Sequence, residues 1–248
     1  MSKEYNFVVS SSPHVRSSED TRSIMLDVII SLIPALAVAV YIFGLRALTL
    51  TLVCVAACVF FEWGYRKLLK KPSSIGDLSA VVTGMLLTFC LPVSVPYWLP
   101  IIGAFFAIVI VKQLYGGIGK NFLNPALAAR AFLFSWPVLM TTWQAPLSYT
   151  KFFNIFGIAD AITAATPMAA LHMGKLPDAT LWQVFIGEIG GSLGEISAIA
   201  LILGGAYLVI RKVISLRIPL SYILTVAVVT FIFPKGGNDS LTWMLYNV

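Results

Sequence analysis

Apolar runs long enough to cross a lipid bilayer recur along this chain and constrain its fold more than any other feature. The first two cover residues 25–43 and 47–63, with a three-residue turn between them. Each approaches the ~20 residues that a spanning helix requires. Charged residues make up only 11% of the chain, against roughly 25% in a soluble domain, and the deficit extends over the whole length. The fold class predicted from these runs is therefore an all-α polytopic membrane protein.

Further apolar runs bring the expected number of transmembrane helices to about seven. They cover residues 78–91, 97–111, 126–143, 196–210 and 218–233. The run 78–91 is short and stops before a proline, so both a spanning helix with a broken end and a re-entrant half-helix stay open. Five runs precede a long non-spanning segment and others follow it, which suggests a five-helix repeat and the start of a second, inverted repeat.

Four regions follow from this pattern. We expect a polar N-terminal arm, a first five-helix membrane repeat, an extracytoplasmic loop and the start of a second membrane repeat, at residues 1–24, 25–143, 144–193 and 194–248. Residues 241–248 resemble the beginning of an eighth apolar run. We therefore expect the natural protein to be longer at its C-terminus.

The positive charges predict the orientation of the chain in the membrane. The net charge is +6, and the lysines and arginines concentrate in residues 1–24, 66–71 and 211–217. Because cytoplasmic loops carry an excess of Lys and Arg, we expect a cytoplasmic N-terminus and an extracytoplasmic loop 144–193 in a cytoplasmic (inner) membrane. Because membrane topology explains the positive charges, we expect membrane lipid as a partner of the chain and do not expect nucleic acid.

Several familiar motifs are incomplete. In residues 114–121 Leu114 replaces the first glycine of a phosphate loop, and Asn121 replaces its Ser or Thr. No G-x-G-x-x-G fingerprint is present. The three cysteines are too few for an ordinary iron–sulfur cluster, and His14 and His172 have no partners at metal spacing. We therefore predict no metal site and no catalytic residue.

Polar residues inside or beside the apolar runs are candidates for an internal site. Arg130 lies within the run 126–143, shortly after Asn124 and a proline. Such a charge either pairs within a polar pocket or extends to the membrane surface, and both alternatives stay open. In the first case Asn124 and Arg130 line an internal polar site. Asp27 and Glu62 lie near the ends of runs and are expected at the interface, whereas Glu195 is expected in the first turn of a helix.

The loop 144–193 contains the pattern Asp-x-x-Thr-x-Ala-Thr, formed by Asp160, Thr163, Ala165 and Thr166. By itself this composition is typical of a turn. The pattern is also similar to the site at which a flavin transferase joins flavin mononucleotide (FMN), through its phosphate, to a threonine hydroxyl. Pro167 favours an extended conformation of Thr166, which would present the side chain.

Three segments together carry a resemblance to a known family. Residues 116–130, 160–166 and 191–197 occur in this order between the expected spans. The chain resembles the RnfD/NqrB family, whose members belong to the Rnf ferredoxin:NAD⁺ oxidoreductase complex and to the sodium-pumping NADH:quinone reductase. The resemblance implies ten spans in two inverted repeats with a fold similar to urea transporters, of which this chain covers about seven.

The resemblance also implies cofactors and partners. It places covalent FMN on Thr166, with Asp160, Thr163 and Ala165 as the flavinylation motif. A second, non-covalent flavin such as riboflavin is expected within the bundle, where Asn124 and Arg130 are the candidate ligands. The partners implied are a flavin transferase and the flavin-, iron–sulfur- and NAD-binding subunits of the complex.

The expected function is electron relay within a complex that couples ferredoxin:NAD⁺ oxidoreduction to transport of Na⁺ or H⁺. The chain would act as a non-autonomous subunit of this translocase, because the cofactor supplies the redox chemistry. Two alternatives remain at this point. One is a solute channel with a urea-transporter-like fold and no redox role, and the other is a structural anchor for other subunits.

Overall fold

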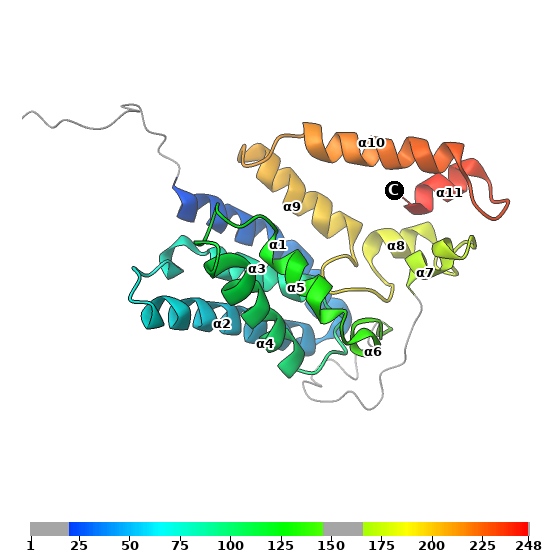
Figure 1. Ribbon diagram of the computed structural model, residues 1–248. Helices are drawn as coiled ribbons and strands as arrows, with labels where there is room; N and C mark the ends of the chain where they lie inside the picture. Colours follow the sequence, from blue (N-terminus) through cyan, green and yellow to red (C-terminus); the bar gives the residue numbers. More distant parts are fainter. Residues whose placement is uncertain (1–19, 146–165, 248) are drawn as a thin grey trace, which may run out of the picture.

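The computed structural model describes residues 20–145 and 166–247, and the elements of this part of the chain are all helices (Figure 1). One of them, η1, is a 3₁₀ helix, and η2 is a π-helix that continues α4 without a break. In chain order the elements are α1 (Thr21–Phe43), α2 (Leu45–Leu68), η1 (Ile75–Asp77), α3 (Ser79–Phe89), α4 (Trp98–Phe105), η2 (Phe106–Gln113), α5 (Pro125–Leu133), α6 (Pro137–Met140), α7 (Pro167–His172), α8 (Leu181–Ile186), α9 (Ala198–Ile210), α10 (Arg217–Ile232) and α11 (Ser240–Asn247).

Two helices, α1 and α2, are long and apolar enough to cross a bilayer, with lengths of 23 and 24 residues. Helix α1 begins at Thr21, where the Asp20 carboxylate accepts a hydrogen bond from the first backbone N–H, so it includes the last residues of the predicted arm. Only Gly44 separates the two helices, and its φ of 76° favours glycine. Helices α3, α4–η2, α9 and α10 are shorter apolar helices. The seven-span count and the division into repeats stay predictions.

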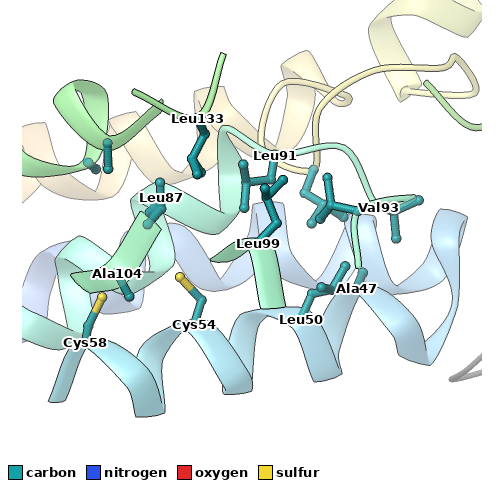
Figure 2. Close-up of a cluster of buried hydrophobic side chains, with 14 of the residues drawn as sticks. Ala47, Leu50, Cys54, Cys58, Leu87, Leu91, Val93, Leu99, Ala104 and Leu133 are labelled. Atoms are coloured by element: carbon teal, nitrogen blue, oxygen red, sulfur yellow. The ribbon is translucent and has the colours of Figure 1, made fainter. Parts of the chain in front are cut away.

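Helix α2 is the centre of the core, and α3, α4 and η2 pack against it. Figure 2 shows the thiols of Cys54 and Cys58 pointing from α2 into buried side chains that include Leu87 and Leu99. A Cβ added at Gly84 of α3 would lie 2.7 Å from the Val55 Cα of α2. Small residues at this contact let the two helices approach closely, which is the usual packing mode in membranes.

The prediction of one continuous span over residues 126–143 is wrong. Helix α5 ends at Leu133 and the short helix α6 begins at Pro137. The Pro137 ring excludes the carbonyl of the residue four positions earlier and offers no N–H, so the helix cannot continue through it. The fourth predicted run is continuous, in contrast, over α4 and η2.

Helix α3 is too short to span the membrane. Its 11 residues correspond to about 16 Å at ~1.5 Å per residue, roughly half of a ~30 Å hydrocarbon core. The non-helical segment after it passes through the protein interior, where the buried guanidinium of Arg46 donates to the carbonyls of Val93 and Val95 at 2.8 and 2.9 Å. These bonds replace the helical ones that the segment lacks. Both alternatives for this run, a spanning helix with a broken end and a re-entrant half-helix, stay predictions.

Helix α9 lies along α1 and connects the second part of the chain to the first. A Cβ at Gly204 would lie 2.2 Å from the Ser31 carbonyl oxygen, so only glycine allows this approach. At one end of the pair, the Asp27 carboxylate accepts from Tyr207 at 2.9 Å and forms an ion pair with Arg211 at 3.2 Å. Asp27 is 6% exposed and its partner Arg211 is 53% exposed, so the interfacial position of this carboxylate stays a prediction.

Candidate functional site

Thr166, the predicted flavin attachment residue, is the N-cap of α7. Its backbone is extended, with φ −72° and ψ 149°, as Pro167 predicts. The Thr166 side-chain oxygen accepts a hydrogen bond from the Ala169 N–H at 3.2 Å, and the residue is half-buried. The hydroxyl is therefore held at the start of a helix. Three other predicted motif residues, Asp160, Thr163 and Ala165, lie outside the described residues.

Asn124 and Arg130, predicted to line an internal site, both line one open cavity of about 370 Å³, and Asn124 itself is exposed. The Asn124 amide oxygen caps α5 by accepting from Ala126 N–H at 3.0 Å. The half-buried Arg130 follows on the same helix, with its guanidinium 5.9 Å from the centre of the Phe134 ring. The complete lining is Leu32, Leu86, Phe89, Cys90, Asn124, Ala126, Leu127, Arg130, Ser192, Gly194, Glu195 and Leu201.

The cavity lies where one helix ends and another begins. The last turn of α3 contributes Phe89 and Cys90, and the first turns of α5 contribute Asn124 and Arg130. The end of α3 is completed by a distant segment, because Gly194 N–H donates to the Phe89 carbonyl at 3.0 Å. Interrupted helices beside a cavity are a usual construction of ligand sites in membrane proteins.

Glu195 lies on the rim of this cavity and not in a helical turn, because α9 begins only at Ala198. Its carboxylate accepts from the Ser192 N–H at 3.2 Å and thereby holds the segment that closes the end of α3. The prediction of a plain helix-dipole role is wrong. Glu195 instead places a negative charge on the same cavity as Arg130.

A buried ion pair that the sequence analysis missed lies between α2 and η2. The Lys112 ammonium is 2.7 Å from the Glu62 carboxylate, and the two side chains are 3% and 0% exposed. Lys112 also donates to the Ser79 hydroxyl at 2.6 Å. The carboxylate further accepts from Gln113 at 2.9 Å and from Ser74. Glu62 is thus enclosed by protein.

Periodicity along α2 gives one sequence signal for the position of Glu62, although it does not identify Lys112. Cys54, Cys58 and Glu62 follow one another at i, i+4 and i+8, so they share one face of α2. That face is buried throughout. The carboxylate therefore had to lie inside the protein, where it needs a cationic partner.

The described residues contain no group of three or more His, Cys, Asp or Glu side chains that could hold a metal ion. Cys54 and Cys58 are buried free thiols on α2, and Cys90 is a half-buried thiol on the cavity. Two ligand positions predicted from the sequence lie within residues 20–145 and 166–247, namely the Thr166 hydroxyl and the cavity beside Arg130.

Comparison with known proteins places these features in a family. The family model described as the NQR2, RnfD, RnfE family matches residues 8–247. The D subunit of the Na(+)-translocating ferredoxin:NAD(+) oxidoreductase complex of Acetobacterium woodii is 48% identical, over 98% of this chain and 73% of that protein. Its counterpart in the proton-translocating complex of Clostridium ljungdahlii is 41% identical, over 96% and 72%. The D subunit of an ion-translocating oxidoreductase complex of Actinobacillus succinogenes is 32% identical, over 94% and 74%. Because both the family model and these relatives extend over nearly the whole chain, the protein belongs to the NQR2, RnfD, RnfE family.

Proposed function

We propose that this chain is a membrane subunit of an ion-translocating ferredoxin:NAD⁺ oxidoreductase and relays electrons through FMN attached covalently to Thr166. The names of the relatives from Acetobacterium and Clostridium support the complex. The observation that carries the cofactor assignment is the position of Thr166, which is extended, half-buried and followed by Pro167, at the end of the Asp-x-x-Thr-x-Ala-Thr pattern.

The local chemistry of Thr166 fits a phosphoester. The Thr166 oxygen would form a bond to the phosphorus of a flavin dinucleotide donor, the P–O bond to the donor's second nucleotide would break, and that nucleotide would leave as a monophosphate while the hydroxyl proton passes to solvent. The phosphate oxygens are strong acceptors, so they can take over the cap of the Ala169 N–H that the hydroxyl now provides. FMN supplies the one- and two-electron chemistry when bound, and Thr166 holds it against loss.

The cavity beside Arg130 is the proposed place for a second, non-covalent flavin such as riboflavin. Its volume of about 370 Å³ lies within the usual range of small-molecule sites. Arg130 supplies hydrogen-bond donors, while side chains such as Leu86 and Phe89 supply an apolar packing surface. Asn124 fixes the start of α5 and with it the position of Arg130.

The membrane location and partners follow from the same proposal. We place the chain in the cytoplasmic membrane with Thr166 on the extracytoplasmic side, beside the other subunits of the complex. A flavin transferase would modify the loop before or during assembly. One contact supports this placement: Lys235 of the α10–α11 turn, also predicted to be extracytoplasmic, donates to the His172 carbonyl of α7.

The attachment is tested by the fluorescence of the protein after denaturing electrophoresis. We expect a fluorescent band from cells with an active flavin transferase, and its loss in Thr166→Ala. The matched control is Thr163→Ala, which removes a nearby hydroxyl and should only weaken the band. Mass mapping should find FMN on the fragment between Lys151 and Lys175, at Thr166. A fluorescent Thr166→Ala variant, or an unmodified wild-type fragment, would contradict the redox proposal and favour a channel.

A further inference from the structure

The C-terminal end of α7 is held by the turn between α10 and α11. The Lys235 ammonium donates to the carbonyl oxygen of His172 at 2.7 Å. The Asn238 amide donates to the carbonyl oxygen of Gly174 at 3.0 Å. Carbonyls at the end of a helix have no partner within the helix, so these two side chains satisfy groups that α7 cannot satisfy itself.

The turn is shaped for this contact. A Cβ at Gly236 would lie 2.0 Å from the Gly174 carbonyl oxygen, so the two backbones meet directly. Gly174 and Gly236 have φ values of 77° and 73°, which glycine adopts without strain. Asn238 also donates to the Lys235 carbonyl at 2.7 Å, which fixes the turn itself. We call residues 234–239 the α7 dock.

A second bond connects the same two parts of the chain. The Tyr246 hydroxyl of α11 donates to the Ala179 carbonyl at 3.0 Å, just before α8. Figure 1 shows α7 and α8 beside α11, apart from the helices around α2. The segment that begins at Thr166 is therefore attached at two places to the α10–α11 hairpin.

We infer that the α7 dock positions the flavin-bearing threonine, with Lys235 and Asn238 as positioning residues. This inference rests on the proposed attachment of FMN to Thr166. Helix α7 has six residues, so its two ends are about 9 Å apart at ~1.5 Å per residue. Over this distance a helix is rigid, and any displacement of its docked end changes the position of Thr166.

The dock also determines which part of the protein carries the flavin. Lys235 and Asn238 belong to the connection between α10 and α11, and not to the helices that pack around α2. A displacement of the α10–α11 hairpin would therefore move Thr166 with it. The position of the flavin is coupled in this way to the second part of the chain.

The experiment measures the fluorescence anisotropy of the attached flavin in the full-length protein, solubilised in detergent. Lys235→Met removes the ammonium and keeps most of the apolar stem, and Asn238→Asp exchanges a donor for an acceptor at constant volume. We expect a loss of anisotropy in both variants at unchanged flavin content per band. Lys235→Arg restores a cationic donor and should restore the anisotropy.

The matched control is Lys175→Met, because Lys175 is an exposed lysine whose ammonium makes none of these three bonds. Its anisotropy should equal that of the wild type. Unchanged anisotropy in both Lys235→Met and Asn238→Asp would overturn the dock, as would an equal loss in the control.

A separate measurement distinguishes a failed dock from a failed flavin assignment. A wild-type protein without covalent flavin contradicts the proposed function only. The dock is then tested with a spin label at Met168→Cys, a 63% exposed position on α7, after replacement of the three native cysteines by alanine. Lys235→Met should sharpen the resonance lines of the label. Identical line shapes would refute the dock independently of any cofactor.

Discussion

The buried pair of Glu62 and Lys112 permits a sharp energetic prediction. Both side chains are enclosed, and their charged groups are 2.7 Å apart. Removing one partner from a buried pair costs about 3–5 kcal/mol, because the remaining charge loses its counter-charge and cannot reach water. We propose the substitutions Glu62→Met and Lys112→Met, which replace each residue by an unbranched apolar side chain of similar length.

The contacts predict which substitution costs more. After Lys112→Met, the carboxylate still accepts from Gln113 and Ser74. After Glu62→Met, the ammonium keeps only the Ser79 hydroxyl of its described contacts. Hydrogen bonds to a charged group contribute about 1.5–3 kcal/mol each. We therefore expect Glu62→Met to lower the free energy of unfolding by about 5 kcal/mol and Lys112→Met to lower it by about 3 kcal/mol.

The double variant is the informative control. With both charges removed, the remaining cost is the unpaired amide of Gln113 and the small hydroxyls, about 1–3 kcal/mol. The double variant should therefore be no less stable than Glu62→Met, and the coupling energy of the cycle should be about 3 kcal/mol or more. If the losses in unfolding free energy of the two single variants simply added up in the double variant, the argument would be refuted. Additivity would mean that neither charge stabilises the other.

Equilibrium unfolding in mixed micelles measures these free energies, with helix content followed by circular dichroism. The same four proteins should be compared at several salt concentrations. Because the pair is enclosed, salt should change its coupling energy much less than that of an exposed pair. A strong salt dependence would mean that Glu62 and Lys112 reach solvent.

The remaining predictions concern topology, the cavity and helix packing. In intact cells an impermeant thiol reagent should label Lys175→Cys and leave Lys71→Cys unlabelled until permeabilisation; the reverse pattern would invert the proposed orientation. Arg130→Leu should impair electron transfer by the assembled complex without reducing covalent flavin fluorescence, and normal turnover would instead assign Arg130 to the membrane surface. Gly84→Ala should destabilise the protein by about 1–3 kcal/mol, because its Cβ would lie 2.7 Å from a backbone atom of α2. Its control is Gly64→Ala on α2, where no atom lies within 4 Å of the added Cβ, so we expect a gain of about 0.5–1 kcal/mol in unfolding experiments.

The helices that the sequence predicted best depend on local properties. Apolar runs and single breaking residues defined α1, α2, α9 and α10 to within a few residues, because helix formation is decided by neighbours along the chain. Gly44 ends α1 because glycine has no Cβ and tolerates a positive φ, and the ring of Pro167 favours the extended backbone of Thr166. The break between α5 and α6 is local in the same way, because the Pro137 ring ends the helix before it.

The charged residues inside the protein show the limit of this reasoning. Near the end of an apolar run, Glu62 and Arg46 look equally suited to the membrane surface. Their actual positions depend on Lys112 and on the carbonyls of Val93 and Val95, which lie 50, 47 and 49 residues away along the chain. A single sequence shows that burying a charge is unfavourable in free energy, but it does not show which residue pairs with that charge.

The candidate sites divide in the same way. The sequence by itself singles out Thr166 as the candidate attachment residue, because its resemblance to a flavinylation motif lies in contiguous residues. Arg130 could be singled out as an unusual charge, but only the tertiary structure decided that it shares a cavity with Glu195 and Cys90. The dock of α7 on Lys235 likewise joins segments more than sixty residues apart. A motif of neighbouring residues can be identified from the sequence alone. A cavity or a dock forms only when packing brings distant helix ends together.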